Sequence, residues 1–226
     1  MSAVLLLAGQ VLYILVTQFH AGGRANDHPA IFAAYAASGI WKAVHVGQFV
    51  CVAILLAWLV ALPFAVNADD AERSRWTGRY GAALAVVALA SYGVLQAVDG
   101  VGNKEVDDAW VNAPTGEKTA RFASAEAMRW LEWGARSYHD FALGLALLLI
   151  GAAILQSKGV PQPIAYLMGL YGLTDLVQGW VVGAEGFSGT HTILILVAWT
   201  FTLAWMIWLL VAAWQTRDSN ASPLAG

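Results

Sequence analysis

Long apolar stretches alternate with short polar segments along the chain, and six of the apolar stretches suit membrane spans. A bilayer core of about 30 Å requires about 20 mostly apolar residues in a helix. Lipid offers the backbone no hydrogen-bond partner, so each span must be a helix rather than an open strand. The predicted spans cover residues 3–19, 40–66, 80–98, 131–155, 163–182 and 191–214. The pattern predicts an all-α fold, a polytopic integral membrane helix bundle of about six transmembrane helices.

One membrane domain accounts for the chain. Residues 1–216 form the predicted transmembrane helical domain, and residues 217–226 form a polar tail. The connection 99–130 is long, and we expect a helix at about 115–137 that runs into the fourth span. The connections 20–39, 99–130 and 183–190 lie on one face of the membrane, and both termini lie on the other.

Composition agrees with a membrane protein. Hydrophobic residues make up 59% of the chain and charged residues 12%, whereas soluble domains carry about 25% charged residues. The net charge of −3 argues against nucleic acid as a partner. Lys and Arg in the short connections favour cytoplasmic termini, so we predict a bacterial cytoplasmic membrane protein.

Polar residues recur at helical spacing on four of the predicted spans, and each row leads to the same end of the bundle. Such rows should face the bundle interior, because polar groups facing lipid cost several kcal/mol. They serve either as hydrogen bonds between helices or as a site. The rows are Gln10, Tyr13, Thr17 and His20; Trp41, His45 and Gln48; Tyr92, Gln96 and Asp99; and Tyr171, Asp175 and Gln178.

The histidines supply the candidate cofactor ligands. His45, His139, His191 and His20 sit near the ends of predicted spans at similar depth, whereas His28 lies in a polar connection and is expected to be solvated. The residues His45, His139 and His191 are the candidate metal ligands, and His20 joins them as a candidate cofactor ligand. Because the histidines lack i, i+4 spacing, any such site needs ligands from different helices.

Intramembrane carboxylates are the sharper functional signal, because they are expensive to bury. Asp175 is the deepest, and it and Asp99 are candidate acid, base or orienting groups. The fourth span opens with Glu126, Arg129, Glu132, Arg136 and Asp140, which can neutralise one another in pairs. In the functional interpretation, Glu132 and Asp140 line a polar cavity and join the candidate catalytic residues.

Three chemistries compete for these residues. Imidazole ligates haem in helix bundles, His with Asp binds zinc or copper, and His with Asp can relay protons. The single cysteine, Cys51, allows no intramolecular disulfide and is expected to be a packing residue. We therefore expect haem or a transition metal, with a cofactor-free site as the alternative.

Two resemblances add to this interpretation. The segment from Trp41 through His45 to Gly47 resembles the start of the haem-ligand helix of membrane-bound styrene oxide isomerase, which implies that His45 is an axial haem ligand. That family has four spans and opens an epoxide with the haem iron. The vicinity of His45 and Gln48, the turn 98–100 and the segment 125–133 resemble bacterial multi-pass proteins of unknown function, which implies a fold and no activity.

Three functions follow from these observations. The first is a membrane-embedded haem or metal protein, an isomerase or oxidoreductase acting on a small apolar molecule in the extracytoplasmic half. The second is a cofactor-free binder or transporter of a lipid or small molecule. The third is an accessory subunit of a membrane complex that docks through the charged segment 99–130. A homo-oligomer is a further possible assembly.

Overall fold

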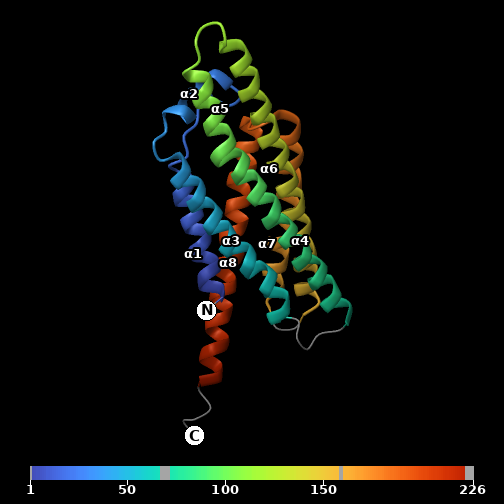
Figure 1. The fold of residues 1–226 in the computed structure, drawn as a ribbon. Helices are drawn as coiled ribbons and strands as arrows, with labels where there is room; N and C mark the ends of the chain where they lie inside the picture. Colours follow the sequence, from blue (N-terminus) through green and yellow to red (C-terminus); the bar gives the residue numbers. More distant parts are fainter. Residues whose placement is uncertain (1, 67–71, 158–159, 222–226) are drawn as a thin grey trace.

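The protein is a bundle of helices (Figure 1). The computed structural model describes residues 2–66, 72–157 and 160–221. Residues 222–226 of the predicted tail lie outside the described residues. The helices are α1 (Ser2–Thr17), α2 (His28–Ala37), α3 (Trp41–Val66), α4 (Glu72–Ala97), the π-helix η1 (Val98–Asn103), α5 (Lys104–Val111), α6 (Lys118–Leu155), α7 (Gln162–Glu185) and α8 (Gly189–Ala221). This architecture agrees with the predicted all-α class.

Among the described residues, four helical segments are long and apolar enough to cross a membrane. They are Trp41–Val66, Glu72–Val111, Lys118–Leu155 and Gly189–Gln215. The apolar part of α1, Ala3–Thr17, is shorter, and α7 is not among the four. The structure therefore supports an integral membrane helix bundle, but it does not confirm that the spans number six.

The connections contain more helix than the sequence pattern predicts. Helix α2 lies within the connection 20–39, where the Asp27 carboxylate accepts a hydrogen bond from the Ala30 amide and Pro29 occupies the first turn. The chain also stays helical beyond residue 98, because η1 joins α4 directly to α5. The expected helix at 115–137 and the fourth span form one helix, α6, from Lys118 to Leu155.

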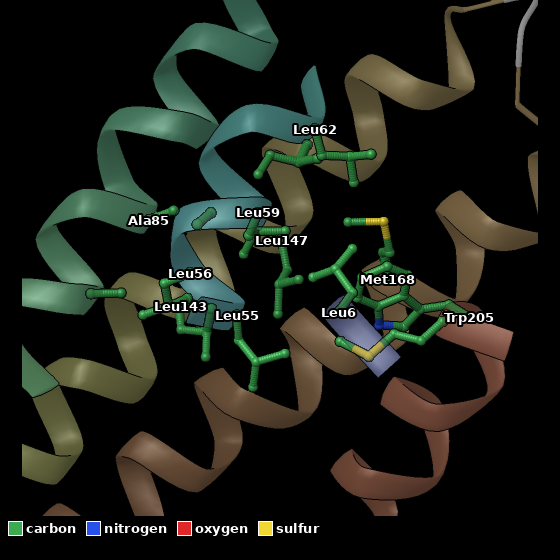
Figure 2. Close-up of a cluster of buried hydrophobic side chains, with 14 of the residues drawn as sticks. Leu6, Leu55, Leu56, Leu59, Leu62, Ala85, Leu143, Leu147, Met168 and Trp205 are labelled. Atoms are coloured by element: carbon green, nitrogen blue, oxygen red, sulfur yellow. The ribbon is translucent and has the colours of Figure 1, made fainter. Parts of the chain in front are cut away.

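The start of α1 and the end of α8 lie at one end of the bundle, and α2, α5 and the turn between α7 and α8 lie at the other (Figure 1). The apolar core fills the space between α1, α3, α4, α6, α7 and α8, and includes Leu6, Leu56, Leu147, Met168 and Trp205 (Figure 2). This core holds the helices together below the end that carries α2 and α5.

Glycines let α6 approach its neighbours closely, as is usual between membrane helices. A Cβ atom on Gly172 would lie 2.7 Å from the Gly144 carbonyl oxygen, and one on Gly144 would lie 2.6 Å from the Gly172 carbonyl oxygen. On the α4 side, a Cβ atom on Gly81 would lie 2.6 Å from Ile150 Cγ1. Helix α6 is therefore fixed tightly between α4 and α7, and its polar residues have well-defined positions.

Candidate metal centre and cavity

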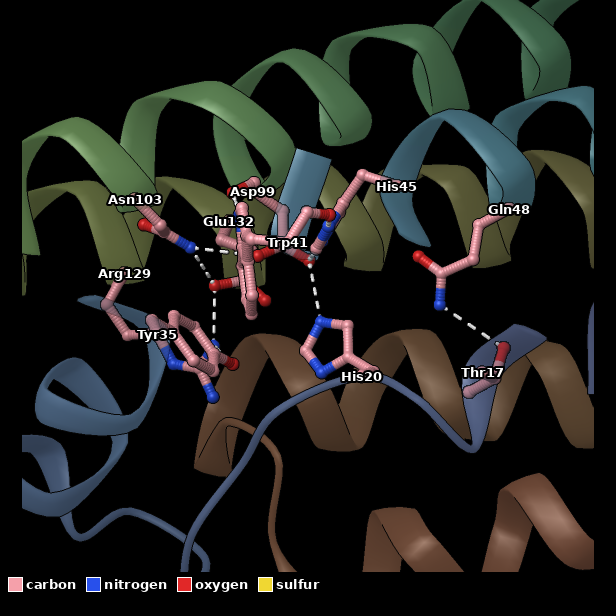
Figure 3. A network of polar contacts seen from close by, with 10 residues as sticks. All are labelled: Thr17, His20, Tyr35, Trp41, His45, Gln48, Asp99, Asn103, Arg129 and Glu132. Atoms are coloured by element: carbon pink, nitrogen blue, oxygen red, sulfur yellow. Dashed lines mark hydrogen bonds and ion pairs between the residues drawn. The ribbon is translucent and has the colours of Figure 1, made fainter. Parts of the chain in front are cut away.

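His20, His45 and Asp99 meet at the end of the bundle that carries α2 and α5 (Figure 3). The Asp99 Oδ2 atom lies 3.0 Å from His45 Nε2 and 3.5 Å from His20 Nε2. One ligand atom from each residue falls within 4.8 Å of the other two. Three different elements thus bring two imidazoles and one carboxylate to a single point.

The π-helix η1 places Asp99 at this point. π-helical turns are rare and frequently occur at functional sites. Glycine at position 100 allows η1 to press against α3, since a Cβ atom there would lie 2.8 Å from the Cβ atom of His45. The Asp99 carboxylate can reach the His45 ring because its neighbour has no side chain.

Hydrogen bonds from α3 orient both His45 and the backbone of Asp99. His45 Nδ1 lies 2.9 Å from the Trp41 carbonyl oxygen, and the Trp41 indole N–H donates to the Asp99 carbonyl oxygen at 3.1 Å. A carbonyl oxygen only accepts, so Nδ1 carries the proton, and in a neutral ring Nε2 presents a lone pair to Asp99. Two acceptor atoms at 3.0 Å require a proton or a cation between them.

Aromatic rings surround His20. Its ring centroid lies 4.8 Å from that of Trp41, 5.0 Å from that of His45 and 5.6 Å from that of Tyr35. Burial among these rings disfavours the charged imidazolium, but the Asp99 carboxylate outweighs this effect and raises the pKa of His20 above its ordinary value. The surroundings of His20 therefore stabilise a positive charge at this position.

A buried polar network connects Asp99 to α6. The Asn103 side-chain amide donates to Asp99 Oδ1 at 3.1 Å and to Glu132 Oε2 at 2.6 Å. Arg129 Nη1 donates to the same Glu132 oxygen at 2.6 Å and to the Tyr35 hydroxyl at 2.9 Å. All these side chains are buried, so the network holds the Asp99 carboxylate in place through its Oδ1 atom. Glu132 is paired with the positive charge of Arg129.

A cavity of about 590 Å³ extends from His20, Asp99 and Glu132 into the apolar core. Helices α1, α3, α4, α6, α7 and α8 all contribute to its wall, and residues 20–23 and Ala25 lie at the end near the histidines. Every polar row predicted from the sequence reaches this wall, except that Trp41 and His45 lie behind it. The rows therefore do face the bundle interior and converge on one space.

The cavity wall carries more acidic than basic side chains. Four carboxyl groups line it, those of Asp99, Glu132, Asp140 and Asp175, against the two guanidinium groups of Arg129 and Arg136. The formal charge of the lining is thus −2 when all four carboxyl groups are ionised and the histidines are neutral. Such a wall favours cations over anions in a low-dielectric environment.

The remaining predicted site residues line the same cavity but do not belong to the His20–His45–Asp99 group. His139 is bound through Nδ1 to the Ala88 carbonyl oxygen at 2.9 Å, and Asp140 pairs with Arg136 at 2.9 Å. Asp175 accepts from the Gln178 amide at 2.9 Å, and the His191 ring is buried. Among the described residues, the structure brings together His20, His45 and Asp99 as a ligand group, without His139 or His191.

Several residues of this site were not expected from the sequence. Asn103 and Tyr35 hold the buried network around the carboxylates, yet Asn103 follows two glycines in a segment that resembles a loop. The alternating charges of Arg129 and Glu132 were a signal, and the structure shows that these two residues pair with each other. His28, expected to be solvated, is partly buried against Glu126 at 3.1 Å.

Comparisons with protein-family models, curated proteins and solved structures find no match for this chain. The function is therefore inferred from the geometry of the metal centre and the cavity.

Proposed function

We propose that His20, His45 and Asp99 bind a divalent transition-metal ion at one end of the cavity, where the protein binds and transforms a small apolar molecule. The observation that carries this proposal is the convergence of two imidazoles and one carboxylate within 4.8 Å, beside a cavity. Two histidines with one carboxylate, and open positions for substrate, are a recurrent donor set for Fe²⁺ and Zn²⁺.

The distances support an ion of this size. Zinc bonds to His nitrogen and carboxylate oxygen measure about 2.0–2.2 Å, so neighbouring ligand atoms in a tetrahedral site lie about 3.3 Å apart. Two of the three ligand–ligand distances, 3.0 and 3.5 Å from Asp99 Oδ2 to the histidine Nε2 atoms, lie on either side of this value, and the third pair is within 4.8 Å, so the two imidazoles would also have to move towards each other. Small side-chain adjustments would therefore complete the site.

The hydrogen bonds that hold the candidate ligands also support a metal. Metal-binding histidines usually donate their other ring N–H to a carbonyl or carboxylate, which fixes the tautomer. His45 makes this bond to Trp41, and Asn103 holds the second oxygen of Asp99. A divalent cation would also balance the formal charge of −2 on the cavity lining.

This donor set fits a bare ion better than a haem. A haem iron needs open space in front of the ligating nitrogen, whereas His45 Nε2 faces Asp99 at 3.0 Å and does not line the cavity. When bound, the metal would supply Lewis-acid or redox chemistry. Glu132, on the cavity wall, would orient the bound molecule or exchange a proton with it, and isomerisation and oxidoreduction both stay predictions.

We further propose that α1 and α7 also cross the membrane, which gives six spans in a bacterial cytoplasmic membrane with cytoplasmic termini. The 24 residues of α7 extend about 36 Å, longer than a bilayer core. Its buried residues include Asp175 and Gln178, which face the bundle rather than lipid. The metal centre would then lie in the extracytoplasmic half.

Metal analysis tests the proposal. Purified protein is incubated with Zn²⁺ or with Fe²⁺ under anaerobic conditions, freed of excess ion, and its bound metal is measured beside the absorption spectrum. We expect one metal ion per chain in the wild type and loss of that ion in Asp99→Asn. The matched control is His28→Asn, which removes a partly buried histidine paired with Glu126 outside the group.

Two results would count against the metal. A folded wild type that holds no stoichiometric ion, or an Asp99→Asn variant that keeps it, contradicts the assignment. A Soret band in the absorption spectrum would instead restore haem as the cofactor.

A second candidate function, a cofactor-free binder of a small molecule, is favoured by the cavity itself. Its volume of about 590 Å³ lies in the range of ligand sites, about 300–1,000 Å³. Ligand-dependent stabilisation of a metal-free wild type would support this candidate.

A further inference from the structure

A second polar group, separate from the metal ligands, lies in the cavity wall between α6, α7 and the start of α8. It consists of Arg136, Asp140, Asp175, Gln178 and His191, which we call the Asp175 group. Asp140, Asp175, Gln178 and His191 are each at most 2% exposed. Asp175 is close enough to Arg136 and Asp140 to experience both charges.

The hydrogen bonds within the Asp175 group leave some of its acceptor atoms without a partner. Arg136 pairs with Asp140, and the Gln178 amide donates to Asp175 Oδ1, which fixes the orientation of that amide. The opposite atoms, Asp175 Oδ2 and Gln178 Oε1, are buried without a well-formed hydrogen bond among the described residues, and so is His191 Nε2; the Tyr171 hydroxyl is near enough to the Asp175 carboxyl to interact with it. Burying such atoms without a partner costs about 1–3 kcal/mol each, so the Gln178 and Asp175 oxygens select for a donor.

The structure fixes these residues firmly. Ser137 donates to the Gly179 carbonyl oxygen at 2.7 Å, and a Cβ atom on Gly179 would lie 2.9 Å from the Ser137 carbonyl oxygen. Helices α6 and α7 therefore touch next to Arg136 and Gln178.

An apolar wall faces the same cavity. Helices α1, α3, α6 and α8 contribute side chains that offer no hydrogen bond to a ligand. They include Leu6, Leu55, Leu59, Leu143, Leu147 and Met206. The cavity therefore combines buried acceptors in one part of its wall with a hydrocarbon surface in another, which is the complement of an amphiphile.

We propose that the Asp175 group binds the hydrogen-bond-donating head of a small amphiphile, a hydroxyl or an amine, whose hydrocarbon part lies against the apolar wall. A hydroxyl or ammonium group donates to Asp175 Oδ2 and Gln178 Oε1. A carboxylate cannot donate to them. The inference rests on the cavity of the proposed function and narrows its small apolar molecule to this class.

Thermal unfolding in phosphatidylcholine nanodiscs tests the inference with four probes of equal chain length: 1-octanol, octylamine, octanoate and octane. We expect octanol or octylamine to raise the Tm of the wild type by about 5 °C or more at saturation. Octane and octanoate should raise it much less. If octanoate or octane stabilises the wild type as much, the proposal is wrong.

Variants locate the effect. Asp175→Asn should abolish the preference for octanol and octylamine over octane. The matched control is Thr174→Ala, whose hydroxyl bonds within its own helix to the Leu170 carbonyl oxygen, away from Asp175. Because both variants sit in the same discs, partitioning of the probes into lipid cancels. A preference that survives Asp175→Asn overturns the inference, and the wild-type comparison decides it where Asp175→Asn does not fold.

The metal centre and the Asp175 group can fail separately. Asp99→Asn removes a metal ligand and should leave the preference for octanol or octylamine in place. A wild type without metal but with this preference refutes the metal and supports the Asp175 group. A metal-loaded wild type without the preference supports the metal centre and refutes the Asp175 group.

Discussion

Replacing Gly100 by Ala tests whether the contact between η1 and α3 builds the metal centre. The new Cβ atom would lie 2.8 Å from His45 Cβ and 3.1 Å from His45 Cγ. Carbon atoms in good contact lie about 3.5–4.0 Å apart, so the first contact is too close by about 0.7–1.2 Å. The His45 Cβ cannot turn away, because its position follows the backbone of α3. The η1 segment, with Asp99, must therefore move.

The expected loss follows from this displacement. Overpacking of a buried contact costs about 1–3 kcal/mol, and a change of 1 kcal/mol shifts Tm by about 2–4 °C in a chain of 150–250 residues. Ligand positions in metal sites are held within about 0.2 Å, so the same shift should weaken metal binding by about tenfold or more. We expect a lower Tm for the metal-free protein and weaker metal binding.

The assay pairs thermal unfolding of the metal-free variant with a zinc titration. Gly93→Ala is the control, because it lies on α4 and its Cβ would meet Phe49 at an ordinary 3.8 Å. Ala is also the better helix former, so the control should be as stable as the wild type or slightly more stable. If Gly100→Ala matches Gly93→Ala in both measurements, the close contact does not position Asp99.

Two further changes test the buried network and the helix packing. Arg129→Met leaves Glu132 buried without its cation and should lower the free energy of unfolding, measured by chemical denaturation, by about 3–5 kcal/mol. The control Arg121→Met breaks an exposed pair and should lower it by about 0.5 kcal/mol or less. Equal effects would refute the buried pairing. Gly172→Ala should lower Tm by several degrees, because its Cβ meets the Gly144 carbonyl oxygen at 2.7 Å, whereas Gly169→Ala meets nothing within 4 Å and should not. The same Tm in both variants would contradict the close packing of α6 and α7.

The polar rows were predictable because a helix places residues i, i+3, i+4 and i+7 on one face. Membrane burial then forces that face inward, so the sequence could assign His20, Asp99 and Asp175 to the interior. Helical spacing fixes the face of each helix but not the depth at which two helices meet. The predicted metal ligands His45, His139 and His191 therefore looked equivalent, although the structure groups His45 with His20 and Asp99 instead.

The π-helix was the main feature that the sequence did not reveal. Residues 98–103 contain two glycines after an apolar run, a composition typical of a loop. One extra residue per turn keeps the chain helical there and carries Asp99 towards His45 and Asn103 towards Glu132. Such a turn depends on close contact with α3, which local sequence does not encode.

X-ray absorption at the zinc edge of the zinc-loaded protein tests the metal centre most directly. We predict nitrogen and oxygen neighbours at about 2.0–2.2 Å and outer-shell scattering from two imidazole rings. Asp99→Asn should remove or disorder this signal. A sulfur shell at about 2.3 Å, or the absence of imidazole scattering, would contradict ligation by His20, His45 and Asp99.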